Sequence, residues 1–423
     1  MWFNIQNLIE FTKFSLGNGL TVIHHEDKAT ELCVLNLLYK VGSKNEEANK
    51  TGFAHLFEHL MFGGSIHIPN YDEPLQLAGG ENNAFTSNDI TNYYLSLPAN
   101  NLETGFWLES DRMLGLAINP KSLKVQKGVV IEEFKERYLN QPYGDIWLKL
   151  LPLAYKKHPY KWPTIGKAIA HIKNANQTDV NDFFKQNYAP NNCILVVAGN
   201  INLEKTKELC NKWFLPIPSQ NILSNPLPQE PVQRKLRRKT VLADVPANLI
   251  VMSFHMDQRQ SKNFYAMDLL SDIMGSGKGS ILYQELIKKK NLFSEIDAYI
   301  TADAEPGLFI IEGRMLPNTT FEMAEEAIWI VLNQVKSKNI DENDLKRAQH
   351  KNETSIRFGD INPLNRAMKL AYAEYLGDVD LVNKEIDNYL AIHTDDIVKE
   401  SKKVFKESNC SILSYKIKKD GSK

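Results

Sequence analysis

Three residues that can bind or activate a metal ion lie close together in the segment Gly52–Gly64, GFAHLFEHLMFGG. His55 and His59 stand four residues apart with Glu58 between them, so a helix places all three on one face. The other positions are mostly apolar, which predicts a buried helix, and buried imidazoles need strong partners. H-x-x-E-H is the inverted form of the H-E-x-x-H zinc motif, in which the glutamate acts as general base. We therefore expect His55 and His59 to bind zinc and Glu58 to be catalytic, although the same letters also fit an ordinary core helix.

A third protein ligand is expected on the segment Lys124–Gln141, which has the composition of a helix. A glutamate that reaches the open side of the histidine pair gives a His2Glu site, with the fourth tetrahedral position left to water. Glu132 and Glu133 are neighbours whose side chains point about 100° apart on a helix, so only one can be the ligand. Val130, Glu133 and Phe134 share the inward face, which favours Glu133. The predicted cofactor is one zinc ion per chain.

Composition limits the possible classes of protein. A chain of 423 residues with 43% hydrophobic content is long enough for two domains of about 200 residues. The 50 basic and 51 acidic residues nearly cancel, which gives no electrostatic case for binding nucleic acid or an anionic membrane. No apolar run approaches the roughly 18–20 residues that span a bilayer, and the first residues lack a signal-peptide pattern. We expect a cytoplasmic chain without membrane insertion, or a periplasmic or organellar one if the sequence is a trimmed mature form.

The chain contains an apparent internal duplication. Gln177–Ile201 and His393–Ile417 each begin with a capped short helix and enter a strand through Asn-Cys. Between them, Pro216–Lys239 is rich in proline and ends in a basic run, which is typical of a linker or a solvated edge strand. We predict an N-terminal zinc-binding domain (residues 1–215), a linker (216–240) and a C-terminal domain without the metal motif (241–423).

Alternating apolar and polar residues indicate the fold class. Strands and helices are mixed with hairpins instead of following a strict strand-helix-strand order, so each half is expected to be α+β around a mainly antiparallel sheet. The predicted strands are residues 20–24, 32–41, a hairpin over 81–97, 249–255, 295–302 and 307–315.

The segment His24–Asp27, HHED, ends one predicted strand, and we expect it to form a solvated turn.

Several segments together resemble the M16 metallopeptidase family, the group of pitrilysin, insulin-degrading enzyme and mitochondrial processing peptidase. They are GFAHLFEHLMFGGS, GGENNAFTSNDITNYY, ESDRM, GVVIEEF and HPY, with a weaker match at GSGKGSILYQELIKKKNLFSEIDAY. The resemblance implies two similar halves, each a roughly six-stranded sheet backed by helices, in the LuxS/MPP-like metallohydrolase fold. It also implies a zinc metalloendopeptidase that degrades unfolded peptides inside a dimeric chamber.

The resemblance also assigns residues. In that family the zinc-binding glutamate ends an E-x6-E stretch, which implies Glu133 as the ligand and leaves Gln126 where the family has a second carboxylate. Substrates in the family add as a strand beside the site. By resemblance, Asn83, Ala84 and Phe85 are therefore the substrate-binding residues.

A departure from the family pattern implies a partner. Active members hold the substrate and the developing oxyanion with an arginine and, seven residues later, a tyrosine. Ile287 and Ser294 occupy those positions, and Lys288, one residue out of register, lacks a planar guanidinium. This implies the zinc-bearing subunit of a heterodimer whose homologous partner supplies the arginine and tyrosine. The alternatives are a self-sufficient homodimeric peptidase, a non-catalytic core or scaffold subunit, and a single-domain small-molecule metalloenzyme with a cysteine ligand.

Overall fold

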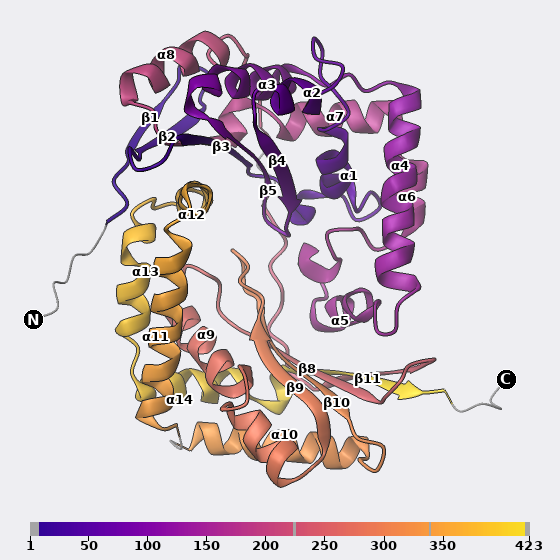
Figure 1. Ribbon diagram of the computed structural model, residues 1–423. Coiled ribbons are helices and arrows are strands. Elements are labelled where there is room, and N and C mark those ends of the chain that lie inside the picture. The colour runs from indigo at the N-terminus through magenta and orange to yellow at the C-terminus, as the bar shows by residue number, and fades with distance from the viewer. Residues whose placement is uncertain (1–7, 223–225, 338–339, 419–423) are drawn as a thin grey trace, which may run out of the picture. The chain divides into compact units, whose positions relative to one another are not determined.

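A computed structural model describes residues 8–222, 226–337 and 340–418. The chain divides into two compact units (Figure 1). Unit 1 comprises Met1–Phe134, Trp162–Leu227 and Arg357–Lys384, and unit 2 comprises Lys135–Lys161, Pro228–Ile356 and Glu385–Lys423. No helix in the described ranges combines the length and the apolar character needed to cross a membrane.

Unit 1 is built on a six-stranded sheet with the order β1-β2-β6-β3-β5-β4. Only β2 and β6 run parallel, and the other neighbours are antiparallel. The central strand β3 has both faces covered, so every one of its residues except Leu32 is buried. The strands are β1 (Thr12–Ser15), β2 (Thr21–Glu26), β3 (Leu32–Tyr39), β4 (Glu81–Thr86), β5 (Thr91–Pro98) and β6 (Cys193–Gly199).

Helices cover both faces of this sheet (Figure 1). On one face, Ala367, Leu370 and Ala371 of α12 (Pro363–Tyr375) pack against the strands β3 and β6. On the other lie α1 (Phe53–Leu60), α3 (Leu102–Leu114) and α8 (Leu203–Trp213), which contact β5, β3 and β2. Alternate residues of one strand therefore enter two different cores, as its pleat requires.

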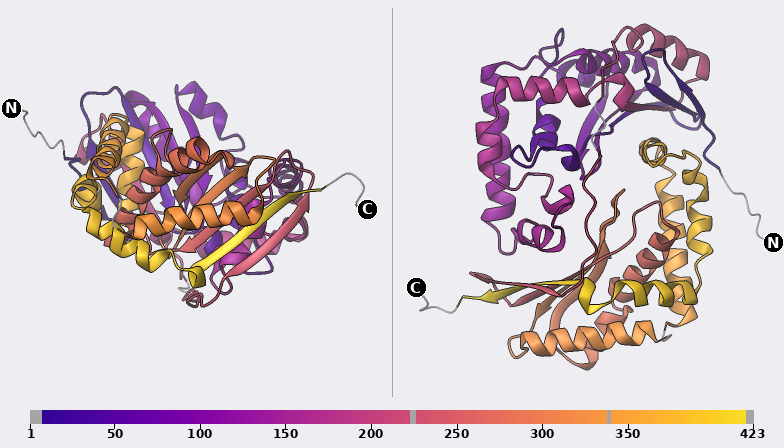
Figure 2. Two further views of the ribbon diagram at one scale, coloured as in Figure 1. Left: turned by 90° about the horizontal axis from the view of Figure 1, so that it is seen from below. Right: turned by 180° about the vertical axis from the view of Figure 1, so that it is seen from behind.

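Unit 2 contains a five-stranded sheet with the order β7-β11-β8-β10-β9. The helix α5 (Ile146–Ala154) packs on one face, and α9 (Lys262–Gly275), α10 (Phe321–Lys336) and α14 (Thr394–Val404) pack on the other (Figure 2). The strands are β7 (Arg237–Ala243), β8 (Leu249–His255), β9 (Phe293–Ile300), β10 (Leu308–Met315) and β11 (Cys410–Ile417). The other α-helices among the described residues are α2 (Asp72–Leu77), α4 (Pro120–Phe134), α6 (Ile169–Asn174), α7 (Gln177–Asn187), α11 (Glu342–Gly359) and α13 (Leu381–Leu390).

The two sheets repeat one topology. In chain order, β2 to β6 correspond to β7 to β11, with the same neighbours and the same single parallel pair. The duplicated segments also agree in detail. The side-chain amide of Asn192 donates to the Asn187 carbonyl at 2.8 Å, and that of Asn409 donates to the Val404 carbonyl at 2.9 Å, five residues back in both cases. The predicted fold class, two similar α+β halves that each contain a mainly antiparallel sheet of roughly six strands, is confirmed, and the two sheets have six and five strands.

The halves exchange segments, which local patterns do not indicate. The helix α5 comes from the first half of the sequence and covers the unit 2 sheet, whereas α12 comes from the second half and covers the unit 1 sheet. The two compact units therefore do not coincide with the two repeats of the sequence. The domain boundaries inferred from the repeat, residues 1–215 and 241–423, stay a prediction.

Two local expectations met different outcomes. The basic end of the predicted linker enters β7, which lies at the edge of its sheet, as an edge-strand interpretation requires.

The solvated turn expected at His24–Asp27 is wrong. His24 and His25 are buried in β2 because both faces of that strand are covered, and His24 Nδ1 lies 3.0 Å from Thr206 Oγ1 on α8.

Candidate metal centre

The helix α1 carries the two histidines and Glu58, and its back face anchors it. Phe53, Leu56, Phe57 and Leu60 are buried, whereas His55, Glu58 and His59 are half-buried. The Phe57 ring stacks on Tyr188, with 5.2 Å between the centroids, and tilts against Phe183 at 4.9 Å. The apolar positions predicted from the sequence therefore fix the helix, so that its polar face is presented in one orientation.

The start of α1 is held by Glu46, which sequence reasoning missed. Its two carboxylate oxygens accept hydrogen bonds from the backbone N–H groups of Gly52 and Ala54, both at 2.9 Å. Burial raises the pKa of this carboxyl to about 8, against the effect of these backbone hydrogen bonds. Gly52 adopts φ +91°, and a Cβ there would lie 2.6 Å from the Ile165 carbonyl oxygen, so glycine is required. No spacing rule connects Glu46 with a helix that begins seven residues later.

Glu133 lies in the last turn of α4, and this helix contacts α1. Val130 and Phe134, on the predicted inward face, are buried, while Glu132 is exposed. Gln126 is half-buried seven residues before Glu133 on the same helix. The helix therefore directs Glu133, and not its neighbour, toward the histidines.

The structure brings the three predicted ligands together. Glu133 Oε2 lies 3.3 Å from His59 Nε2 and 3.7 Å from His55 Nε2. One ligand atom from each residue can be chosen so that all three lie within 4.8 Å of one another. With metal–ligand bonds of about 2.0–2.1 Å, tetrahedral coordination separates neighbouring donor atoms by roughly 3.3–3.4 Å. Two imidazole nitrogens and one carboxylate oxygen at these separations fit a zinc ion, and the described residues contain no other such group.

Glu58 lies beside the ligands and has a defined partner. Its Oε2 accepts a hydrogen bond of 2.5 Å from the Thr86 hydroxyl. Thr86 ends β4, which packs against α1. Glu58 lies on the same helix between His55 and His59 and does not belong to the group of three donors.

The three predicted substrate-binding residues lie on β4, the last strand of the unit 1 sheet. Its inner edge pairs with β5, where Ala84 stands opposite Tyr93, and no described strand pairs with its outer edge. Asn83 is exposed and Phe85 is 40% exposed. The Ala84 N–H donates to the Asn83 side chain at 2.8 Å. An open strand edge with accessible side chains can receive an extended peptide.

Two further motif segments are structural. Within ESDRM, the Arg112 guanidinium is buried, donates to both oxygens of Glu109 and lies over the rings of Tyr71 and Tyr93 at 4.7 and 4.6 Å. Tyr71 also donates to Glu109 at 2.5 Å. Within HPY, the buried Tyr160 hydroxyl accepts from the Glu305 N–H at 3.1 Å inside unit 2. These residues fix elements together and carry no reactive group at the histidines.

The second-half residues aligned with the family arginine and tyrosine have other contacts. Ile287 lies on a π-helical segment, Tyr283–Lys289, and packs against the unit 2 core. Ser294 is on β9, and its hydroxyl donates to the Arg314 carbonyl at 3.2 Å. Lys288 is exposed. None of the three offers a guanidinium or a phenol.

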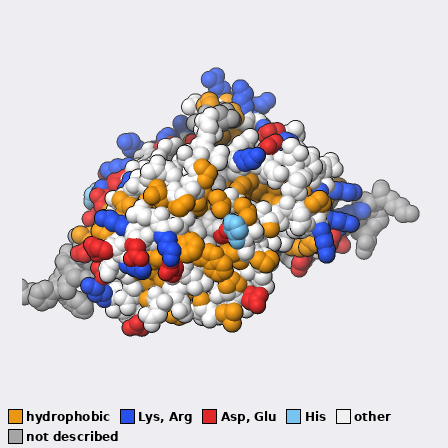
Figure 3. Space-filling view, turned by 90° about the horizontal axis from the view of Figure 1, so that it is seen from above, with side chains coloured by type: hydrophobic (Ala, Val, Ile, Leu, Met, Phe, Trp, Pro, Cys, Tyr) orange, Lys and Arg blue, Asp and Glu red, His pale blue; other side chains and the backbone are white. Residues whose placement is uncertain are grey.

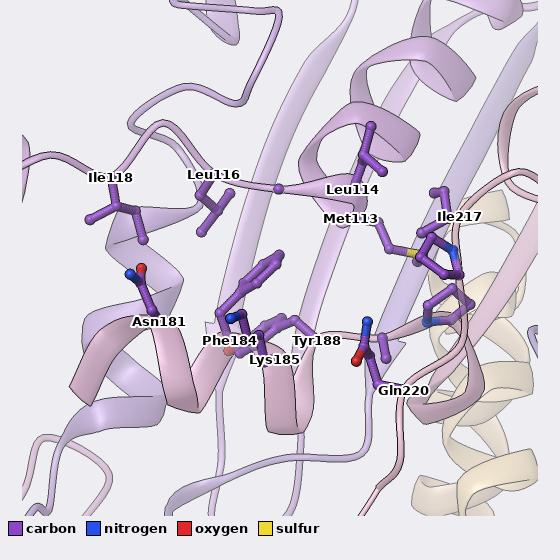
Figure 4. A pocket seen from close by; sticks show the side chains of 14 residues that line it. Met113, Leu114, Leu116, Ile118, Asn181, Phe184, Lys185, Tyr188, Ile217 and Gln220 are labelled. Carbon is purple, nitrogen blue, oxygen red and sulfur yellow. The ribbon is translucent and has the colours of Figure 1, made fainter. Parts of the chain in front are cut away.

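Unit 1 also has a pocket that contains none of the predicted site residues. Figure 3 shows hydrophobic side chains gathered on the face near α3. The pocket has a volume of about 370 Å³ and lies between α7 and the chain that follows α3 (Figure 4). Phe184 and Tyr188, which line it, also stack on Phe57 of α1, so the pocket borders the back of the histidine helix.

Comparisons with known proteins give two family matches and several relatives. The profile of the Insulinase (Peptidase family M16) group matches residues 21–167, and that of the Peptidase M16 inactive domain matches residues 174–352. A relative named zinc protease PqqE from Helicobacter pylori is 28% identical over 412 residues, which are 95% of this chain and 92% of the relative. An uncharacterized zinc protease from Rickettsia felis is 22% identical over 411 residues, which are 95% of this chain and 97% of that protein.

Solved structures show the same fold over the whole chain. The crystal structure of a protease from Helicobacter pylori superposes with a TM-score of 0.91 at 27% identity, covering 97% of this chain and 100% of that one. A peptidase M16 inactive domain from Pseudomonas fluorescens superposes with a TM-score of 0.85 at 15% identity, covering 98% and 99% of the two chains. Two family profiles that together span most of the sequence, and relatives that match nearly end to end, show that this chain belongs to peptidase family M16.

Proposed function

We propose that this chain is a zinc-dependent endopeptidase that hydrolyses unfolded peptides. The observation that carries the proposal is the group formed by His55, His59 and Glu133, whose donor types and separations fit zinc. The names of the relatives, zinc proteases, support the same metal and the same reaction class. A core or scaffold subunit without activity would not require this donor set to be kept.

The side chains have separate roles in this proposal. His55, His59 and Glu133 would hold the ion, which when bound supplies a Lewis acid that activates water and polarises the scissile carbonyl. Glu58 acts as general base toward that water and then donates the proton to the leaving amine. Glu58 lies on the helix that carries both histidines, and the Thr86 hydroxyl donates to one of its carboxylate oxygens. An oriented carboxylate near the donor group is what the role of general base requires.

Peptide binding is proposed to occur along the outer edge of β4. An extended substrate adds there as a further strand, with main-chain hydrogen bonds to the region of Asn83 and Ala84 and a side-chain contact with Phe85. Because main-chain groups are the same in every residue, such binding favours unfolded peptides over folded proteins. It leaves sequence preference to the pockets between side chains.

A homologous partner subunit is the finer part of the proposal. Ile287 packs in the core and Ser294 bonds to a backbone carbonyl, so this chain lacks the arginine and tyrosine expected at these positions. Loss of an oxyanion donor typically lowers the rate by about 10²–10³-fold. A partner that carries both residues would restore that rate, whereas a self-sufficient homodimer would not need one.

Three single variants test the metal and the base. Elemental analysis should find one zinc per chain in the wild type and in Glu58→Gln, and much less in Glu133→Gln. The matched control is Glu132→Gln, which changes the exposed neighbour on the same helix and should keep zinc and activity. In a fluorogenic-peptide assay, Glu58→Gln should lose at least about 10²-fold in turnover. Equal zinc in Glu133→Gln, or full turnover in Glu58→Gln, would refute the assignment.

The partner is tested by adding it. Hydrolysis of an unstructured peptide should be slow with the isolated chain and rise by about 10²-fold or more when a homologue lacking H-x-x-E-H but carrying the arginine and tyrosine is added. The control is the same homologue with its arginine changed to alanine. Full activity of the isolated chain, unchanged on addition, would favour the homodimer.

A further inference from the structure

We infer that Thr86 is a positioning residue for the catalytic base, an inference that rests on the proposed function. Thr86 closes β4, the strand proposed to receive the substrate, and donates its hydroxyl hydrogen to Glu58 Oε2 at 2.5 Å. One hydrogen bond to a carboxylate oxygen limits the rotation of the whole carboxylate, so it fixes the direction of the second oxygen as well. The bond joins the peptide-binding strand directly to the base.

The turn that follows Thr86 is fastened to a short loop, Gly42–Glu46. The Ser43 N–H donates to the Ser87 carbonyl at 3.2 Å, and the Lys44 N–H donates to the Asn88 carbonyl at 2.9 Å. Gly42 lies so close to this turn that a Cβ would come within 2.5 Å of Asn88 backbone atoms. The loop therefore follows the turn closely and leaves it little room to shift.

A buried ion pair strengthens the same attachment. Lys44 Nζ lies 2.8 Å from Asp89, with both side chains less than a tenth exposed, and also donates to the Tyr375 hydroxyl at 3.0 Å. Removing two charges from water is costly, and such pairs contribute more reliably to a specific geometry than to stability. Here the geometry is the position of the turn directly after Thr86.

The other end of this loop holds α1. Glu46 accepts the hydrogen bonds from Gly52 and Ala54 at the helix start. Five consecutive residues, Gly42–Glu46, thus contact both the turn that follows Thr86 and the helix that carries Glu58. The Thr86–Glu58 distance is determined from both sides, so the hydrogen bond is a built feature of the site and not a chance surface contact.

This arrangement has a consequence for turnover. Removing the hydroxyl should weaken the restraint on the orientation of the Glu58 carboxylate without changing the donor group or the edge of β4. Hydrogen bonds to charged groups correspond to effects of about 10- to 100-fold in rate. We therefore expect Thr86→Val, which keeps the shape but not the donor, to lower kcat by about 10- to 100-fold with KM and zinc content within about twofold.

The test compares Thr86→Val with a rescue and a control. Thr86→Ser retains the hydroxyl and should stay within about threefold of the wild-type kcat. Thr240→Val makes the same change at an exposed position of β7 and should alter nothing. Crystal structures give a readout independent of activity: the Glu58 carboxylate should hold one orientation in the wild type and lose it in Thr86→Val.

The outcomes are distinguishable. A kcat unchanged in Thr86→Val, or a KM that rises instead, refutes the positioning role while the peptidase proposal stands. Loss of zinc in Thr86→Val would show a merely structural role. A wild type that hydrolyses no peptide, alone or with the homologue, refutes the proposed function and with it any role of Thr86 in turnover.

Discussion

The carboxylate of Glu46 gives the sharpest test of how the zinc helix is positioned. Glu46→Ala removes the acceptor for two N–H groups, those of Gly52 and Ala54, in a fully buried place. Loss of one helix-cap interaction costs about 1–2 kcal/mol, and an unsatisfied buried donor costs about 1–3 kcal/mol. We expect Glu46→Ala to lower the free energy of unfolding by about 2–4 kcal/mol in total. The sum is not larger because water can enter the space left by the side chain and accept hydrogen bonds from the N–H groups.

This cost should appear in zinc affinity as well as in stability. His55 lies in the first turn of α1, next to Ala54, so an unravelled helix start removes one ligand from its position. Binding zinc must then restore the turn, and the energy needed is taken from the binding free energy. At about 1.4 kcal/mol for each tenfold change, the zinc dissociation constant should rise by about 30- to 1,000-fold.

Chelator competition measures this constant directly. The matched control is Glu47→Ala, whose side chain is 69% exposed and lies 4.0 Å from Lys50, and it should leave the constant within about twofold. Above pH 8, where the Glu46 carboxyl is ionised, Glu46→Gln should fall between the two, because an amide has only one acceptor oxygen. A zinc affinity in Glu46→Ala equal to that of the control would contradict this account of the helix start.

Two further predictions concern stability. Burial lowers the pKa values of His24, His25 and His255 below their ordinary value of 6.5, so these groups contribute stability that is present above pH 6.5 and is lost as the pH falls below it. Burial raises the pKa of Glu46 to about 8, so this carboxyl contributes in the opposite direction, and the wild-type curve sums both effects. Urea titrations between pH 7.5 and 5 should compare the wild type with His255→Asn, which cannot titrate. On acidification the wild type should lose more stability, or gain less, than the variant, and an identical pH dependence in the two would refute the prediction. Arg112→Lys cannot keep the two hydrogen bonds to Glu109 and the ring contacts, so it should lower the free energy of unfolding by about 2–4 kcal/mol. The control is Arg238→Lys, in an ion pair whose arginine is 53% exposed, which should lower it by less than about 1 kcal/mol. Equal unfolding midpoints for these two variants would show that the buried arginine contributes nothing beyond its charge.

Much of the site could be predicted because its signals are local. The spacing of His55, Glu58 and His59 needs only one helix, and the burial of Val130 and Phe134 follows from periodicity on another. The fold class follows from strand and helix patterns repeated in each half. The need for a third ligand and the inward face of the second helix favour Glu133, and the resemblance to a known family implies the same residue.

The remaining features depend on tertiary contacts. Glu46 and Thr86 act on α1 from a loop and from a strand end, and neither position has a local pattern that marks it. The exchange of α5 and α12 between halves is equally hidden, since each helix has the same amphipathic pattern whichever sheet it covers. The expected solvated turn at His24 and His25 is wrong for the same reason, because burial of β2 is set by helices distant in sequence.

The central claim is that His55, His59 and Glu133 hold a zinc ion, and anomalous diffraction tests it most directly. Crystals of the purified chain measured on both sides of the zinc absorption edge should give one strong peak per chain. That peak should lie about 2.0–2.2 Å from Nε2 of each histidine and from an oxygen of Glu133, with Glu132 outside bonding distance. No peak at this position in zinc-saturated crystals, or a peak bound through other side chains, would contradict the account.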